Sequence, residues 1–247
     1  MNNIELLSSL NHQIVTLAKN AMSILTSDIL ADYRALVGGK PVGDTYDKGV
    51  RTSVWDTRYN DFVNGADTYG YRTLKIDRNI WAVPVVYDAA SRALYVLSST
   101  KNLRAVISNW DKGRRTHYLH LLTAVSKDRD NQQLSLFEDD MTEDSERFEK
   151  AQAILGELIQ EAEHVVVIHY DYVGDNAFNG TISLLDREAH IAASISVDDY
   201  LDDDEAKKLS SMTPVDVEAN ASQEVAKPSL VAWRGKKKPS DGGKGEQ

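Results

Sequence analysis

Residues 81–98 read Trp-Ala-Val-Pro-Val-Val-Tyr-Asp-Ala-Ala-Ser-Arg-Ala-Leu-Tyr-Val-Leu-Ser, and no other stretch of the chain signals its local structure as clearly. Two apolar runs rich in β-branched and aromatic residues flank a polar turn at residues 88–92. This pattern predicts a β-hairpin. Pro84 has no N–H to donate to a strand partner, so we expect it at a bulge or at a sheet edge.

Similar signals recur on both sides of the hairpin. Residues 69–76 alternate polar and apolar side chains, which predicts a strand before it. Apolar runs at 164–173, 181–185 and 190–197 predict a second meander, with turns at 174–176, 179–180 and 186–188. Helical spacing of apolar residues precedes each meander. We therefore expect an α+β fold, in which antiparallel strand meanders with flanking helices share one sheet or form two layers.

An apolar stripe in steps of three and four residues predicts one helix over residues 4–25. The stripe lasts about three heptads, which is long enough for a coiled-coil or dimer seam. Paired Glu and Lys residues are missing beside it, so packing on a sheet or another helix is the favoured interpretation. The stripe consists of Leu7, Leu10, Ile14, Leu17, Ala21 and Ile24.

The composition is that of an ordinary globular protein. Of the 247 residues, 42% are hydrophobic and 27% are charged, and the net charge is −10. This acidic balance argues against a generally basic nucleic-acid-binding surface, while leaving room for a local basic patch. The absence of cysteine excludes disulfides, thiolate–zinc sites and cysteine nucleophiles. The first residues lack signal-peptide features and no apolar run could cross a bilayer, so we expect a cytoplasmic protein.

Shifts in composition divide the chain into four segments. Residues 1–126 form an N-terminal α+β part, and 127–142 form an exposed acidic linker. Residues 143–205 contain a helix and further antiparallel strands, and we expect them to belong to the same domain. Thr142 is the expected N-terminal cap of that helix. Residues 206–247 are mostly polar and are expected to be a disordered tail.

Three clusters are candidates for ligand or nucleic-acid contact. Residues 53–62 mix aromatic and hydrogen-bonding groups, as a ligand or nucleotide pocket would, although the aromatic spacing favours a short helix that plugs the core. Residues 101–115 are the most basic part of the folded chain and predict an exposed face that touches phosphate. Residues 229–238 combine an aromatic side chain with lysines, which fits partner docking or a solubilising tail equally well. The candidate residues are Trp55, Asp56, Arg58, Arg114, Arg115, Trp233, Lys236, Lys237 and Lys238.

The sequence shows no clear enzymatic signature, so we expect no cofactor and no metal. His169 and Asp171 alternate onto one strand face as a general acid–base pair would, but polar residues on the solvent side of a half-buried strand give the same pattern. His117 and His120 lack a third metal ligand nearby. The acidic run 198–205 lacks the ligand spacing of a calcium loop and fits a solvated helix start.

The segment 127–142 contains three apolar residues, Leu134, Leu136 and Phe137, in polar and acidic surroundings. They either fold back onto the domain or enter a groove on another protein. The pentapeptide Gln133-Leu134-Ser135-Leu136-Phe137 resembles the motif by which many bacterial proteins bind the sliding clamp of DNA polymerase. That motif has glutamine, leucine, serine or aspartate, leucine and phenylalanine, in this order. One departure is position, because such motifs often lie at a chain terminus.

The resemblance implies a role for each residue of the pentapeptide. Gln133 would form hydrogen bonds at one subsite of the clamp, Leu136 and Phe137 would enter an apolar pocket, and Leu134 and Ser135 would set the backbone. The remainder resembles bacterial and phage domains, a likeness that implies no activity. We therefore expect a protein-binding or regulatory factor of DNA replication or repair, or a phage- or toxin-type inhibitor of either.

The alternative function is that of a nuclease-like enzyme recruited by the clamp. Such an enzyme needs clustered carboxylates and a lysine, and Asp88 with Lys101 is the nearest approach in this sequence. The sequence leaves the oligomeric state open.

Overall fold

The computed structural model describes residues 3–25, 27, 29–31, 35, 48–78, 81–127, 138–173 and 176–202. The chain divides into two units, Met1–Ala206 and Lys207–Gln247. All structural features below belong to the first unit. None of the helices in the described residues has the length and apolar character needed to span a membrane.

One six-stranded sheet forms the centre of the first unit, with the strands in chain order from β1 to β6. β3 and β4 are parallel, and every other neighbouring pair is antiparallel. Two three-stranded meanders therefore share one sheet instead of forming two layers. The predicted α+β fold class is confirmed. The strands are β1 (Arg72–Arg78), β2 (Trp81–Asp88), β3 (Ala93–Ser99), β4 (His164–Val173), β5 (Asn176–Leu185) and β6 (Ile191–Ser196).

The predicted hairpin is present as β2 and β3, with Val85 opposite Val96. Val85 is the first residue of β2 that pairs with β3, so Pro84 lies just outside that ladder. The carboxylate of Asp88 holds the turn, because it accepts hydrogen bonds from the backbone N–H and the hydroxyl of Ser91.

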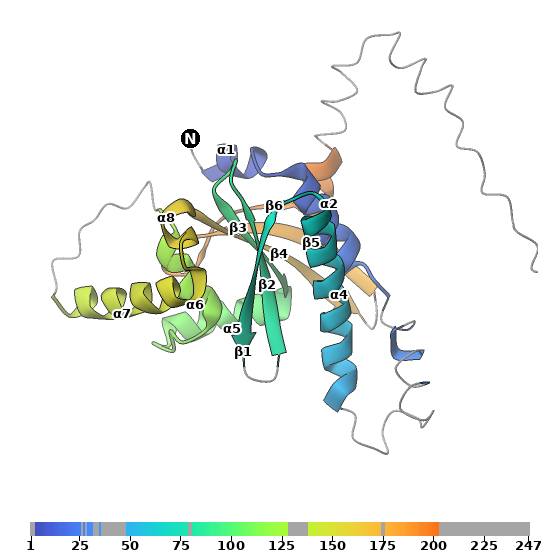
Figure 1. Ribbon diagram of the computed structural model, residues 1–247, viewed down its shortest axis with the longest axis horizontal. Helices are drawn as coiled ribbons and strands as arrows, with labels where there is room; N and C mark the ends of the chain where they lie inside the picture. Colours follow the sequence, from blue (N-terminus) through green and yellow to red (C-terminus); the bar gives the residue numbers. More distant parts are fainter. Residues whose placement is uncertain are drawn as a thin grey trace, which may run out of the picture. The chain divides into compact units, whose positions relative to one another are not determined.

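Helices cover both faces of the sheet (Figure 1). Successive residues of β3 and β4 are buried although their side chains point to alternate faces, which requires a cover on each side. One group contains α1 (Asn3–Ser8), α2 (His12–Met22) and α4 (Lys48–Thr68). The other contains α5 (Thr100–Asp111), α6 (Tyr118–Leu122), the 3₁₀ helix η1 (Thr123–Val125), α7 (Glu138–Leu155) and α8 (Leu158–Glu161). Residues 197–202 are also helical, as expected for the start of the acidic run.

The single helix expected over residues 4–25 is wrong, because Asn11 begins a new helix. Its side-chain oxygen accepts hydrogen bonds from the backbone N–H groups of Gln13 and Ile14, at 3.1 and 3.3 Å. Most of the predicted stripe is nevertheless buried within the unit. This burial agrees with packing inside the molecule and leaves little of the stripe for a dimer seam.

Two further predictions of local structure need correction. Residues 48–68 form the continuous helix α4 rather than an irregular segment with a short helix. The aromatic spacing was informative, because Tyr59 and Phe62 are buried as a core plug. Helix α7 begins at Glu138, earlier than the predicted start at Thr142.

The predicted turn at residues 179–180 is a bulge inside β5. His169 pairs with Thr181 and Asp171 with Phe178, so Asn179 and Gly180 together lie opposite Tyr170. Asn179 has a φ of 50°. A Cβ atom on Gly180 would lie 2.5 Å from the Tyr170 ring, so the close approach of that ring requires glycine.

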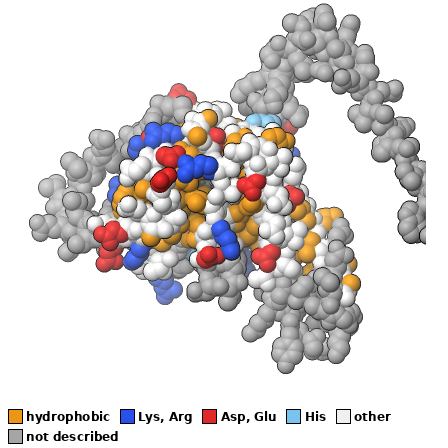
Figure 2. Space-filling view, viewed as in Figure 1, with side chains coloured by type: hydrophobic (Ala, Val, Ile, Leu, Met, Phe, Trp, Pro, Cys, Tyr) orange, Lys and Arg blue, Asp and Glu red, His pale blue; other side chains and the backbone are white. Residues whose placement is uncertain are grey.

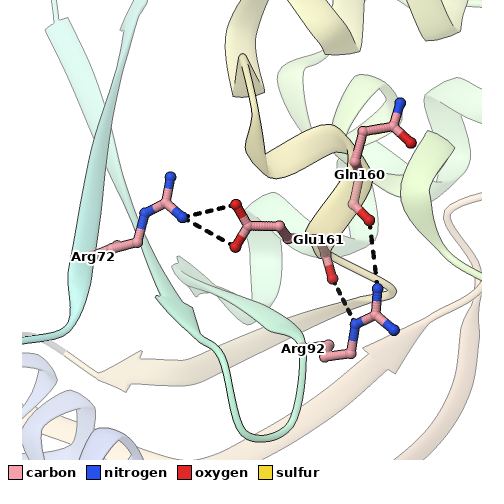
Figure 3. Close-up of polar contacts among 4 residues, drawn as sticks. All are labelled: Arg72, Arg92, Gln160 and Glu161. Atoms are coloured by element: carbon pink, nitrogen blue, oxygen red, sulfur yellow. Dashed lines mark hydrogen bonds and ion pairs between the residues drawn. The ribbon is translucent and has the colours of Figure 1, made fainter.

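Two arginines attach α8 to the first meander (Figure 3). Arg72 of β1 donates to both carboxylate oxygens of Glu161, at 2.9 and 3.0 Å. Arg92, in the turn between β2 and β3, donates to the backbone oxygens of Glu161 and Gln160, at 2.8 and 3.4 Å. These bonds position the chain where it enters β4.

Candidate functional site

The pentapeptide at residues 133–137 lies outside the described residues, and so do Trp233, Lys236, Lys237 and Lys238. The structure does describe the chain just before the pentapeptide segment. Ser126 donates its hydroxyl to the backbone oxygen of Leu185 at 3.1 Å, and Lys127 donates its backbone N–H to Glu163 at 3.0 Å. The chain is thus fixed to the sheet up to Lys127.

Lys127 also binds Glu163 through its side chain, with 2.6 Å between Nζ and Oε1. Arg92 forms a second ion pair with the same carboxylate. The Glu163 side chain is 11% exposed, and the hydrogen bond from Lys127 lowers its pKa below the ordinary value. Glu163 is therefore a charged residue that holds Lys127 on the domain.

At the predicted pocket, residues 53–62, Arg58 stacks on Trp55 and on Tyr172 of β4. The guanidinium carbon of Arg58 lies 4.4 Å from the Tyr172 ring centroid and 5.4 Å from that of Trp55. Arg58 is 3% exposed and donates to the backbone oxygen of Ile24 at 3.3 Å. Asp56 is exposed and takes no part in this stack. The stack joins α4 to β4, as the core-packing interpretation expects.

The predicted basic segment contributes Arg115 to a pocket of about 400 Å³. Its guanidinium carbon lies 4.6 Å from the centroid of the Trp110 ring. Arg114 is exposed but does not line the pocket. On the face drawn in Figure 2, the basic and acidic side chains of the described residues are interspersed. The lining consists of Gly113, Arg115, Thr116, Leu121, Glu146, Arg147 and Lys150.

Sequence reasoning missed Arg147, the most buried cation of that pocket. It is 6% exposed and lies 4.9 Å from the centroid of the Trp110 ring. The next residue of α7, Phe148, is apolar but 37% exposed. Arg147 precedes the buried Ala151 by one helical turn, and this position on the core-facing side was the signal available in the sequence.

The pair His117 and His120 has a structural role. Nδ1 of His117 accepts from the backbone N–H of Leu119 and caps α6, and Nε2 of His120 lies 2.9 Å from the Val106 oxygen. Burial lowers the pKa of His120. Throughout the part of the chain that the structure describes, no three His, Asp or Glu residues are grouped to hold a metal ion.

His169 is buried, so its predicted place on a solvent face is wrong. Its Nδ1 lies 3.0 Å from Thr100 Oγ1 and its Nε2 lies 2.9 Å from Ser183 Oγ. Burial lowers the pKa of His169 to about 4, and the charge of Asp171 acts in the opposite direction. The neutral ring is enclosed between two hydroxyl groups. The bulge in β5 shifts the strand register between His169 and Asp171. This is the environment of a core histidine rather than of a general base.

Asp88 and Lys101 do not form a catalytic pair. Asp88 ends β2 beside the start of β3, whereas Lys101 follows the end of β3, so the two lie at opposite ends of that strand. The Asp88 carboxylate also holds its turn and accepts from Asn11 Nδ2 at 3.3 Å.

These features define an α+β protein with one mostly antiparallel sheet, helices on both faces and a local basic pocket. The chain belongs to a family of unknown function (DUF5986), which it matches over residues 43–246. Neither a curated protein nor a solved structure matches the chain.

Proposed function

We propose that this protein docks on the sliding clamp of bacterial DNA polymerase through Gln133, Leu134, Ser135, Leu136 and Phe137. It would act in the cytoplasm as a recruiting or regulatory factor in DNA replication or repair, or as an inhibitor of either. The observation that carries the proposal is the sequence itself, in which all five positions agree with the clamp-binding motif.

The surroundings of the pentapeptide support this proposal. Two contacts attach Lys127 to Glu163. The chain that leads to the pentapeptide therefore leaves the domain from a fixed residue. Asp128 and Asp130 precede the pentapeptide, and Glu138, Asp139 and Asp140 follow it. Charged flanks disfavour burial of the segment in its own domain.

The affinity expected for such a dock follows from two opposing terms. Burial of the Leu136 and Phe137 side chains contributes roughly 3–6 kcal/mol. Ordering of the segment offsets much of the total interaction energy, so we expect a dissociation constant in the micromolar range, about −8 kcal/mol with the remaining contacts included.

The direct test is calorimetric titration of the full chain against a purified bacterial sliding clamp. The variant Leu136→Ala/Phe137→Ala should bind at least about 100-fold more weakly, which corresponds to about 2.7 kcal/mol. Phe148→Ala is the matched control, because it removes an exposed aromatic side chain from α7 outside the pentapeptide. Equal affinities of the double variant and the wild type would refute the proposal.

Two single substitutions test the motif separately from general hydrophobicity. Gln133→Ala removes the polar anchor and should weaken binding. Ser135→Asp places the other residue that the motif accepts at the third position and should preserve binding. A loss of binding with Ser135→Asp as large as with Gln133→Ala would speak against recognition of this motif.

A further inference from the structure

A basic pocket lies between the loop after α5 and the middle of α7. We propose that it binds the phosphate group of a nucleotide, either free or within a nucleic-acid strand. The proposal rests on the described side chains that line the pocket and does not depend on the sliding clamp.

The charge of the pocket wall is opposite to that of the whole chain. Arg115, Arg147 and Lys150 contribute three positive charges and Glu146 contributes one negative charge, which leaves an excess of two positive charges in a chain of net charge −10. The Glu146 carboxylate lies 3.2 Å from Lys150 Nζ. Such a wall favours an anion with one or two negative charges, as phosphate diesters and monoesters have.

The two guanidinium groups are held in place by one aromatic ring. Arg115 and Arg147 reach the Trp110 ring from different elements, with 4.6 and 4.9 Å between guanidinium carbon and ring centroid. Trp110 in turn meets the His120 ring edge-on at 5.3 Å, and His120 is held by the Val106 oxygen. A guanidinium that is already positioned loses less conformational freedom when it binds a phosphate through its planar pair of donors.

The size and the remaining lining of the pocket fit a nucleotide better than a bare phosphate. A volume of about 400 Å³ lies within the range of small-molecule pockets and exceeds what one phosphate group fills. Leu121 offers an apolar contact for a sugar or base, and the Thr116 hydroxyl can donate or accept a hydrogen bond. The pocket thus combines a cationic part with an uncharged part, as a nucleotide does.

The experiment titrates the full-length protein with thymidine 5′-monophosphate, with thymidine and with a short oligothymidylate that lacks terminal phosphates. Binding of a phosphate-bearing probe should be saturable and should weaken as salt is added. Thymidine should not bind. Binding of the monophosphate alone identifies a free nucleotide as the ligand, and tighter binding of the oligonucleotide identifies a strand. Failure of both phosphate-bearing probes, or equal binding of thymidine, would overturn the proposal.

Charge-neutralising variants assign the binding to this pocket. Arg115→Gln and Lys150→Gln should each bind the preferred probe about tenfold more weakly, which corresponds to about 1.4 kcal/mol. Arg104→Gln makes the same change at an exposed position of α5 outside the pocket and should bind as the wild type does. Thermal unfolding establishes which variants are folded. Unchanged affinity in a folded pocket variant, or an equal loss in Arg104→Gln, would contradict the assignment.

Discussion

Lys127 contacts Glu163 twice, through its backbone N–H at 3.0 Å and through its Nζ at 2.6 Å. The same carboxylate forms an ion pair with Arg92, which also donates to α8. Glu163 therefore joins the β2–β3 turn, the last described residue before the pentapeptide and the entrance to β4. A single carboxylate with two basic partners should influence both stability and its pH dependence.

We expect Glu163→Gln to lower the free energy of unfolding by about 1–2 kcal/mol. The amide keeps the shape of the side chain but removes the charge that Lys127 and Arg92 neutralise, and the exposure of these two partners limits the effect. The pKa of Glu163 is lowered in the folded protein, so its contribution is present above the unfolded pKa and is lost as pH falls through the folded pKa.

Urea unfolding at neutral and acidic pH measures both effects of Glu163→Gln. Glu157→Gln is the control, because Glu157 is exposed and makes no side-chain capping bond at α8. The role assigned to Glu163 is incorrect if the two variants are equally stable at neutral pH.

Stability should also fall between about pH 6.5 and pH 4 because of His169. Its folded pKa of about 4 lies below the ordinary value of 6.5, so the unfolded chain binds more protons in this window. The contribution is fully present above pH 6.5 and is lost as pH falls toward 4, with a total of about 3 kcal/mol.

The variant His169→Gln should have a shallower stability–pH slope over this window. Some slope should remain, because the pKa of His120 is lowered as well and acts with the same sign. His190→Gln is the control, since His190 is 42% exposed and pairs with Asp111 at the surface. Urea unfolding across the pH range gives the slopes, and a steep slope that survives in His169→Gln would disprove the assignment.

Gly180→Ala should destabilise the fold by about 2–3 kcal/mol. The new methyl group would lie 2.5 Å from the Tyr170 ring, and Tyr170 is buried. Gly70→Ala provides the comparison, because Gly70 has a positive φ of 75° but no neighbour within 4 Å of an added Cβ. It should lose only about 1 kcal/mol through backbone strain. Thermal unfolding of both variants measures the difference, and equal losses would mean that the ring moves aside.

The strands were the part of the fold best predicted from sequence, because their signals are local. The two apolar runs and the turn at residues 88–92 follow one another directly in the sequence. The strands that they form pair as the sequence predicts. The bulge at Asn179 and Gly180 uses the same residue types as a tight turn. What makes it a bulge is the ring of Tyr170 across the ladder, and that contact was not visible in the local pattern.

The candidate site was less predictable for a similar reason. Arg115 belongs to a basic run in the sequence, but Arg147, which lines the same pocket, comes from helix α7, which is distant in the sequence. Arg58 looked like a ligand contact because its residue type suits one, yet the rings of Trp55 and Tyr172 occupy its guanidinium. Residue type indicates which groups can bind an anion, whereas packing decides which of them face a pocket.

Asn11 explains why a continuous apolar stripe forms two helices, and it provides the last prediction. Its side-chain oxygen caps α2 and also accepts from the Tyr71 hydroxyl at 3.1 Å, while its amide donates to Asp88. Asn11→Ala removes the cap and these two contacts, so we expect a loss of about 2 kcal/mol, at the upper end for an N-cap. Asn20→Ala, at an exposed position of α2, should cost much less. Urea unfolding of the two variants makes the comparison, and a similar small change in both would show that distant packing, rather than Asn11, sets the break between α1 and α2.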